Sequence, residues 1–84
     1  MRVRGIRGAT QLEADSSAEM IDAVSQLLSE MLSANGVKTD DLISIILTST
    51  PDLTSEFPAV AARKIGLGSV PLLCAVEIDV KGSL

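Results

Sequence analysis

The chain has 84 residues, 46% of them hydrophobic, and a formal net charge of −4, so it forms one small domain whose limited core favours stabilisation by oligomerisation. The acidic balance excludes a basic surface for nucleic acid or an anionic membrane, and the lack of a secretory leader or an apolar run of about 20 residues predicts a cytoplasmic protein. One cysteine and no histidine exclude an internal disulfide and the common histidine-based zinc sites.

Residues 1–10 predict a first β-strand with an arginine set between two glycines. Alternation along a strand places Arg7 on the face opposite the two earlier arginines. Gly5 and Gly8 have no Cβ to obstruct a ligand, so the planar guanidinium can bind a carboxylate or phosphate. The plainer alternative is an exposed arginine at a strand end beside turn glycines.

An amphipathic helix is predicted to follow a polar connection at residues 10–15. Ser16 and Glu19 have the spacing of a capping box that opens this helix. Asn35-Gly36 ends it, because either residue can adopt the left-handed conformation common at helix C-termini. Its apolar residues recur at three- and four-residue steps and predict one buried stripe: Met20, Ile21, Val24, Leu27, Leu28, Met31 and Leu32.

A buried central strand and a second helix are predicted next. Residues 42–48 form a nearly continuous aliphatic run, which is typical of a strand covered on both faces. The hydroxyl-rich loop at residues 49–56 is the kind of segment that carries function on a rigid scaffold. Phe57-Pro58 opens a short, alanine-rich helix that ends at Gly66. Phe57, the only aromatic residue, is either a site residue or an ordinary core side chain.

Residues 70–80 predict a third strand, which completes the order strand, helix, strand, helix, strand. Alternation places Cys74 and Glu77 on opposite faces of it. Cys74 is otherwise a small buried hydrophobe, and Glu77 an ordinary solvated carboxylate. The order of elements predicts an α/β domain with helices on one face of the sheet. A sheet of three strands with one uncovered face is barely stable alone. We therefore expect that face to be buried between subunits.

Three segments carry a family resemblance, in this order: RGIRGAT at residues 4–10, TSTPDLTSEFPAVAAR at 48–63 and VPLLCAVEIDVKGSL at 70–84. In this combination the chain resembles the trimeric, Bacillus-type chorismate mutases over its whole length. The resemblance implies a small mixed β-sheet with helices on one face, and a homotrimer resembling an α/β-barrel with active sites at subunit interfaces. It also implies the isomerisation of chorismate to prephenate in aromatic amino-acid biosynthesis, a pericyclic step that needs neither metal nor cofactor.

The resemblance also implies roles for individual residues. Arg7 binds a substrate carboxylate, while Glu77 and Cys74 hydrogen-bond the ring hydroxyl. Because these two residues are predicted on opposite faces of one strand, a strand that serves two adjacent interface sites would remove the conflict. The neighbouring subunit supplies the wall of the site, here called the wall residues: Phe57, Ala59, Val60, Arg63, Leu72 and Leu73.

The chain departs from the family pattern in two places. Val60 stands where some members have a lysine, and the family continues past residue 84 into a fourth strand with an arginine on the ether oxygen and a tyrosine. We therefore expect residues 1–84 to form a single domain that lacks this C-terminal part, either as a fragment or as a natural truncation. We expect this domain to have little or no activity alone. The alternatives are a non-catalytic trimeric ligand-binding or assembly module and a small α/β domain of unrelated function.

Overall fold

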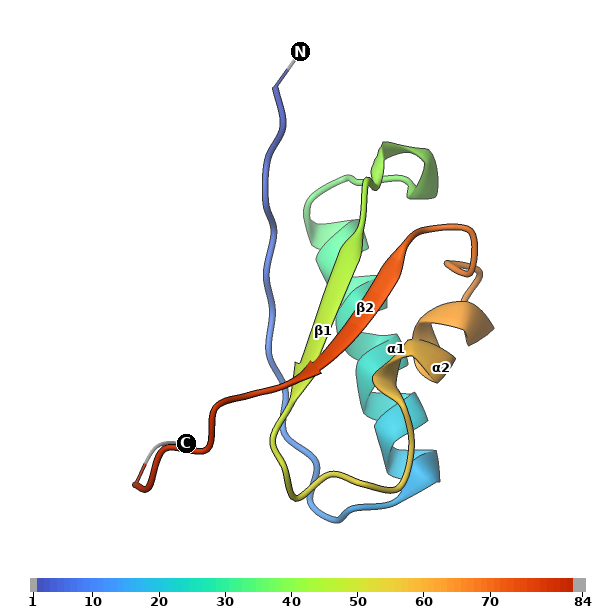
Figure 1. Cartoon of the computed structure of the whole chain (residues 1–84). Coiled ribbons are helices and arrows are strands. Elements are labelled where there is room, and N and C mark those ends of the chain that lie inside the picture. Colours follow the sequence, from blue (N-terminus) through green and yellow to red (C-terminus); the bar gives the residue numbers. More distant parts are fainter. Residues whose placement is uncertain (1, 83–84) are drawn as a thin grey trace.

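The computed structural model describes residues 2–82; Met1 and the last two residues of the predicted terminal turn lie outside this range. Along the chain it has helix α1 (Ser17–Ala34), a 3-10 turn η1 (Thr39–Asp41), strand β1 (Ile45–Ser49), helix α2 (Pro58–Lys64) and strand β2 (Leu72–Val76). Both helices lie on the same side of the two strands (Figure 1). This is the α/β arrangement predicted from the order of elements.

Helix α1 begins and ends where its local sequence predicts. The Ser16 side chain accepts a hydrogen bond from the Glu19 N–H at 3.1 Å, which satisfies one of the free donors of the first turn. The Glu19 carboxylate binds the N–H of Glu13 at 2.7 Å and not that of Ser16, so the capping box is only half formed. At the other end Gly36 has a φ of 61°, the left-handed value expected there.

Strands β1 and β2 pair in parallel, with Ile45 opposite Leu72 and Ser49 opposite Val76. Helix α2 forms the connection between them, as parallel strands require. The described residues contain one sheet, of these two strands. Side chains alternate between the face toward the helices and the opposite face, here called the outer face. On the outer face Ile46 and Leu73 are directly paired and are 66% and 59% exposed.

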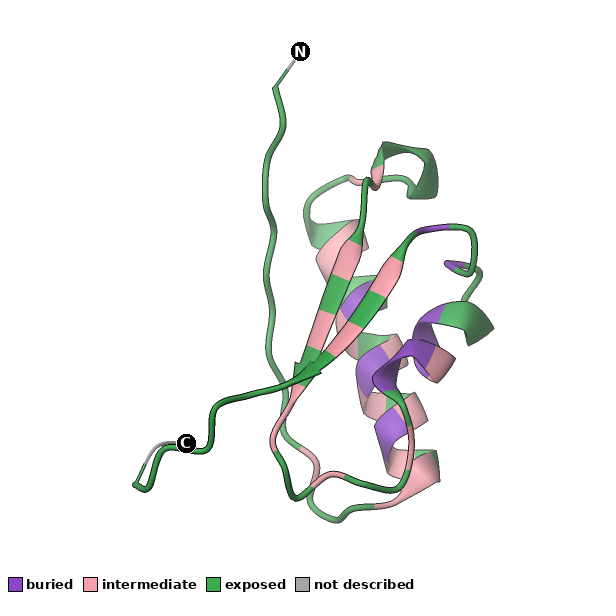
Figure 2. Cartoon of the chain, in the orientation of Figure 1, coloured by how far each residue is buried: buried purple, intermediate pink, exposed green. Residues whose placement is uncertain are grey.

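The hydrophobic core lies between α1, α2 and the inner face of the sheet (Figure 2). Ala61 and Ala62 are completely buried, and their small side chains allow α2 to approach α1 closely. Leu67, three residues beyond the end of α2, is also buried, because its N–H bonds the Ala62 carbonyl at 3.0 Å and folds the chain back. The remaining members of the core cluster are Met20, Val24, Leu28 and Val70.

The predicted first strand is not a strand in the structure. Residues 2–12 run extended beside α1 but form no ladder with β1 or β2 (Figure 1). A strand is defined by its hydrogen-bonded neighbour, and side-chain alternation alone does not supply one. The other two strands are shorter than predicted or shifted: β1 starts at Ile45, not at residue 42, and β2 covers only the middle of residues 70–80.

Two further features are absent from the described part of the chain, a membrane-spanning helix and a cluster of metal-binding side chains. Among residues 2–82, no helix is long and apolar enough to cross a membrane. Within the same residues, no group of three or more potential metal-binding side chains lies together.

Candidate active site

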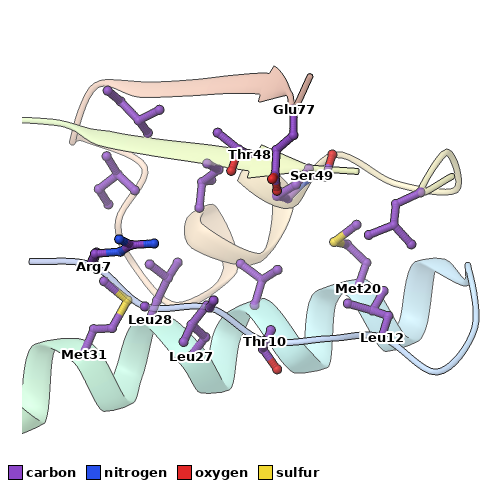
Figure 3. A pocket seen from close by; sticks show the side chains of 18 of the residues that line it. Arg7, Thr10, Leu12, Met20, Leu27, Leu28, Met31, Thr48, Ser49 and Glu77 are labelled. Carbon is purple, nitrogen blue, oxygen red and sulfur yellow. The ribbon is translucent and has the colours of Figure 1, made fainter. Parts of the chain in front are cut away.

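A large open cavity, here called the Arg7 cavity, lies between the N-terminal segment, helix α1 and strand β1. Its volume is about 900 Å³. Apolar side chains of α1 form its floor, including Leu27, Leu28 and Met31 (Figure 3). Arg7 lines it from the N-terminal segment and Glu77 from the end of β2, so two segments at opposite ends of the sequence meet here.

Arg7 is held at this cavity by the contact of its segment with α1. A Cβ placed on Gly8 would lie only 2.8 Å from the Met31 sulfur, so Gly8 permits the chain to lie directly on the helix. Gly5, in contrast, has open space where a Cβ would be. The Arg7 guanidinium has no hydrogen bond or ion pair with any part of residues 2–82. Its five donors are therefore available to an anion.

Glu77 is the first residue beyond β2, not a member of the strand as predicted. Its N–H bonds the Ser49 carbonyl at 2.9 Å, which extends the pairing of the two strands by one bond. This bond holds the Glu77 side chain at the Arg7 cavity, next to Thr48 and Ser49 (Figure 3). The Glu77 carboxylate has no hydrogen-bond partner among the described residues. It can therefore accept a hydrogen bond from a donor such as a ligand hydroxyl.

Cys74 and Phe57 line a second cavity of about 380 Å³, here called the Phe57 cavity. It lies between β2 and the loop formed by residues 50–57, called loop 50–57. Cys74 is a free, half-buried thiol on the inner face of β2. Phe57 is 69% exposed, so this ring is not a core side chain within one chain.

Four of the nine predicted site residues line one of the two cavities, and the other five line neither. Arg7 and Glu77 share one cavity, and Phe57 and Cys74 share the other. Of the other wall residues, Ala59 is buried in α2, Val60 is half-buried and Arg63 is exposed at the end of the same helix. Leu72 packs against the core, and Leu73 points outward. Within residues 2–82, neither cavity collects all nine predicted residues.

A polar cluster next to the Phe57 cavity was not predicted. The Asp15 carboxylate accepts hydrogen bonds from the N–H groups of Thr54 and Ser55, both at 3.0 Å, and from the Thr54 hydroxyl at 2.9 Å. The hydrogen bond from the Thr54 N–H is the main reason why the pKa of Asp15 is lowered. The sequence signal was weak: an acidic residue before a helix cap and a hydroxyl-rich loop almost forty residues later.

Known proteins with similar sequences or structures point to one family. The family model for chorismate mutase type I matches residues 3–84. The chain is 52% identical over 83 residues to chorismate mutase AroH of Thermus thermophilus, covering 98% of this chain and 68% of that protein. It is 42% identical over 85 residues to chorismate mutase AroH of Bacillus subtilis strain 168, covering 100% of this chain and 67% of that protein.

A solved structure agrees with these sequence matches. The chorismate mutase from Clostridium thermocellum superimposes with a TM-score of 0.87 at 47% sequence identity, over 89% of this chain and 67% of that one. The chain therefore spans about two thirds of the length of each of these three relatives. The family match covers all but the first two residues. This chain belongs to the type I chorismate mutase family.

Proposed function

We propose that this chain isomerises chorismate to prephenate by a pericyclic rearrangement, with weak turnover by residues 1–84 alone, at sites formed between the chains of a homotrimer. The observation that carries the proposal is the Arg7 cavity, which a guanidinium and a carboxylate line without a partner among residues 2–82, in a chain of this family. A pericyclic reaction has no covalent enzyme intermediate, so the site needs no activated nucleophile.

The proposed chemistry is positioning combined with fixed charge. Chorismate carries two carboxylates and a ring hydroxyl, and it must be held in its compact conformer before the bonds rearrange. Arg7 binds one carboxylate with two N–H donors, and Glu77 accepts a hydrogen bond from the ring hydroxyl. Cys74, a weak donor, contributes a contact to the hydroxyl from the Phe57 cavity of a neighbouring chain. Both charges are fixed before the reaction starts, so they cost no reorganisation during it.

The separation of the two cavities supports a site formed between chains of the proposed trimer. One chain presents the Arg7 cavity at one place and the Phe57 cavity at another, so a complete site requires the Phe57 region of one chain to reach the Arg7 cavity of the next. The exposed ring of Phe57 and the exposed Arg63 support this proposal. The apolar outer face, with Ile46 and Leu73 largely exposed, supplies a surface for the association.

The proposal includes a cytoplasmic location. The lone cysteine is free and half-buried, which suits a reducing compartment. Chorismate and prephenate are small, diffusible and charged, so an enzyme that works on them has no need of a membrane surface.

The test is to incubate the purified chain with chorismate and follow the loss of its ultraviolet absorbance, comparing the wild type with Arg7→Ala. Arg2→Ala is the matched control, because Arg2 is exposed and does not line the Arg7 cavity. We expect Arg7→Ala to lower kcat/KM about 100-fold or more, the usual cost of losing one preorganised charge. Equal rates for the two variants would reject the assignment of Arg7.

A calorimetric titration with a bicyclic transition-state analogue adds a second measurement. If the wild-type chain binds this analogue without turning over chorismate, it acts as a ligand-binding module and not as an enzyme. If it neither binds nor reacts, the chain has only an assembly role. Sedimentation at several concentrations tests the trimer, and a monomer throughout would reject the interface site.

A further inference from the structure

Asp15 joins two segments that are far apart in sequence. Both of its carboxylate oxygens are occupied by loop 50–57: one accepts the N–H groups of Thr54 and Ser55, and the other accepts the Thr54 hydroxyl. The Ser55 hydroxyl donates in return to the Asp15 backbone carbonyl at 2.9 Å. Four hydrogen bonds thus connect Asp15, upstream of α1, to two consecutive loop residues. We call this group the Asp15 clasp.

Few other bonds hold the loop. Within loop 50–57 the backbone makes one turn bond, from the Leu53 N–H to the Thr50 carbonyl at 3.1 Å. Glu56 accepts the Ser17 hydroxyl at 3.0 Å and, through its other oxygen, the N–H of Phe57 at 2.9 Å. The half-buried Leu53 side chain adds an apolar contact with the core. The conformation of the loop therefore depends mainly on the residues that precede α1 and begin it.

Phe57 lies two residues after Ser55, the last residue of the clasp. Phe57 is the N-cap of α2, but its side chain cannot cap the helix, so the ring is free to extend outward. Thr54, Ser55 and Phe57 all line the Phe57 cavity. The Phe57 ring is only three residues from Thr54, so a shift of Thr54 would move the ring. The buried alanines of α2 would stay in the core.

We propose that Asp15 is a positioning residue for the active site, which fixes loop 50–57 so that Phe57 is preordered before substrate binds. The inference rests on the proposed function for its catalytic consequence, but the clasp itself can be tested without any ligand. Asp15 is fully exposed and contributes nothing to the core, so removing its side chain frees the loop and leaves the fold intact. The low pKa of Asp15 agrees with this picture, because the bound carboxylate prefers to stay charged.

The first experiment measures amide hydrogen exchange at Thr54 and Ser55 by NMR in the wild type, Asp15→Ala and Asp22→Ala. Asp22 is an exposed aspartate on α1 whose carboxylate has no hydrogen bond in the described part of the chain, so it is the matched control. We expect Asp15→Ala to speed exchange at these two amides at least 10-fold, with α1 unchanged. Asp15→Asn should lie in between, because its amide oxygen can still accept the two backbone bonds. Unchanged exchange in Asp15→Ala would overturn the clasp.

The second experiment separates KM from kcat on the same variants. A loop that must become ordered on binding weakens the binding of the substrate and of the transition state equally. KM therefore rises and kcat changes little. We expect KM about 2- to 10-fold higher in Asp15→Ala, partial recovery in Asp15→Asn and wild-type values in Asp22→Ala. A lower kcat with an unchanged KM would overturn the positioning role.

The two proposals fail in different ways. If the wild-type chain does not turn over chorismate, the proposed function fails, and exchange at Thr54 and Ser55 still decides whether the clasp holds the loop. If the wild type is active but Asp15→Ala matches Asp22→Ala in both experiments, only the positioning role fails.

Discussion

The two faces of the sheet differ in what covers them. On the inner face, two helices bury Met20, Leu67 and a pair of alanines almost completely. On the outer face, Ile46 and Leu73 lie opposite each other and are largely exposed. A single chain therefore completes its own helical core but leaves apolar surface on the other side. The comparison separates what one chain stabilises by itself from what we assign to its assembly.

The same division runs through the active site. The core that positions the site is complete within one chain, whereas Arg7 and Phe57 line separate cavities. Substitutions on the two faces should consequently behave differently. Those on the inner face should change stability at every protein concentration, and those on the outer face only where chains associate.

Met20→Ala should have the largest effect on stability. Met20 is 2% exposed between α1 and the sheet, and its truncation removes buried apolar surface and leaves a cavity. We expect the free energy of unfolding to fall by about 2–5 kcal/mol. Urea denaturation followed by circular dichroism measures this change. A loss smaller than 1 kcal/mol, independent of protein concentration, would mean that the helical core contributes less to stability than its burial indicates.

The elements of this core were predictable because their signals are local. Ser16 and Asn35-Gly36 lie at the ends of α1, and Gly66 follows Ile65, the C-cap of α2, with its own left-handed φ of 92°. A cap needs only a few adjacent residues to be recognised. The α/β order followed from the same local patterns, and the family resemblance supplied the fold and function beyond them.

The remaining features depend on contacts that sequence spacing does not encode. Residues 2–12 alternate like a strand but have no ladder partner in the described chain. Glu77 was assigned a strand face, but it lies beyond the end of β2, where its N–H bond to Ser49 sets its direction. No local pattern connects Asp15 with Thr54. Residue types could be selected from the sequence, but their division between two cavities required the fold.

Ile46→Ser combined with Leu73→Ser tests the outer face. In dilute solution we expect the free energy of unfolding of the double variant to lie within about 0.5 kcal/mol of that of the wild type, because both side chains are already exposed. At concentrations near 100 times the dissociation constant, association should stabilise the wild type by about 2.7 kcal/mol, and the double variant should lose this gain. Thermal unfolding at several concentrations measures both. An identical concentration dependence in the two proteins would show that chains do not associate through this face.

Gly8→Val compared with Gly5→Val tests how the N-terminal segment is held. A side chain at position 8 must displace Met31 and Leu27, whose flexible ends can move, so we expect a cost of about 1 kcal/mol. Position 5 has open space, so the cost there should stay below about 0.5 kcal/mol. Urea unfolding gives both values, and tryptic cleavage after Arg7 should be faster only in Gly8→Val. Equal cleavage in the two variants would contradict the contact with α1.

The smallest expected effect is the pH response of the Asp15 clasp. The pKa of Asp15 is lowered in the folded protein from its ordinary value of 3.8, chiefly by the Thr54 N–H. A lowered folded pKa means that the contribution to stability is present above the unfolded value and is lost as pH falls through the folded one. The amide signals of Thr54 and Ser55 should therefore shift with a midpoint below 3.8, as NMR titration can show.

The carboxylates of Glu19 and Glu56 lie in the same region and bind Glu13, Ala14, Ser17 and Phe57. Because these other carboxylates are close by, the control must remove the charge of Asp15 alone. Asp15→Asn does this, and in that variant the low-pH shift of Thr54 and Ser55 should disappear. A midpoint above 3.8 in the wild type, or an unchanged shift in Asp15→Asn, would show that the loop amides do not bind a charged Asp15. A pKa at or below the ordinary value of 3.8 leaves Asp15 ionised at neutral pH, so loop 50–57 should remain clasped under the conditions in which the enzyme works.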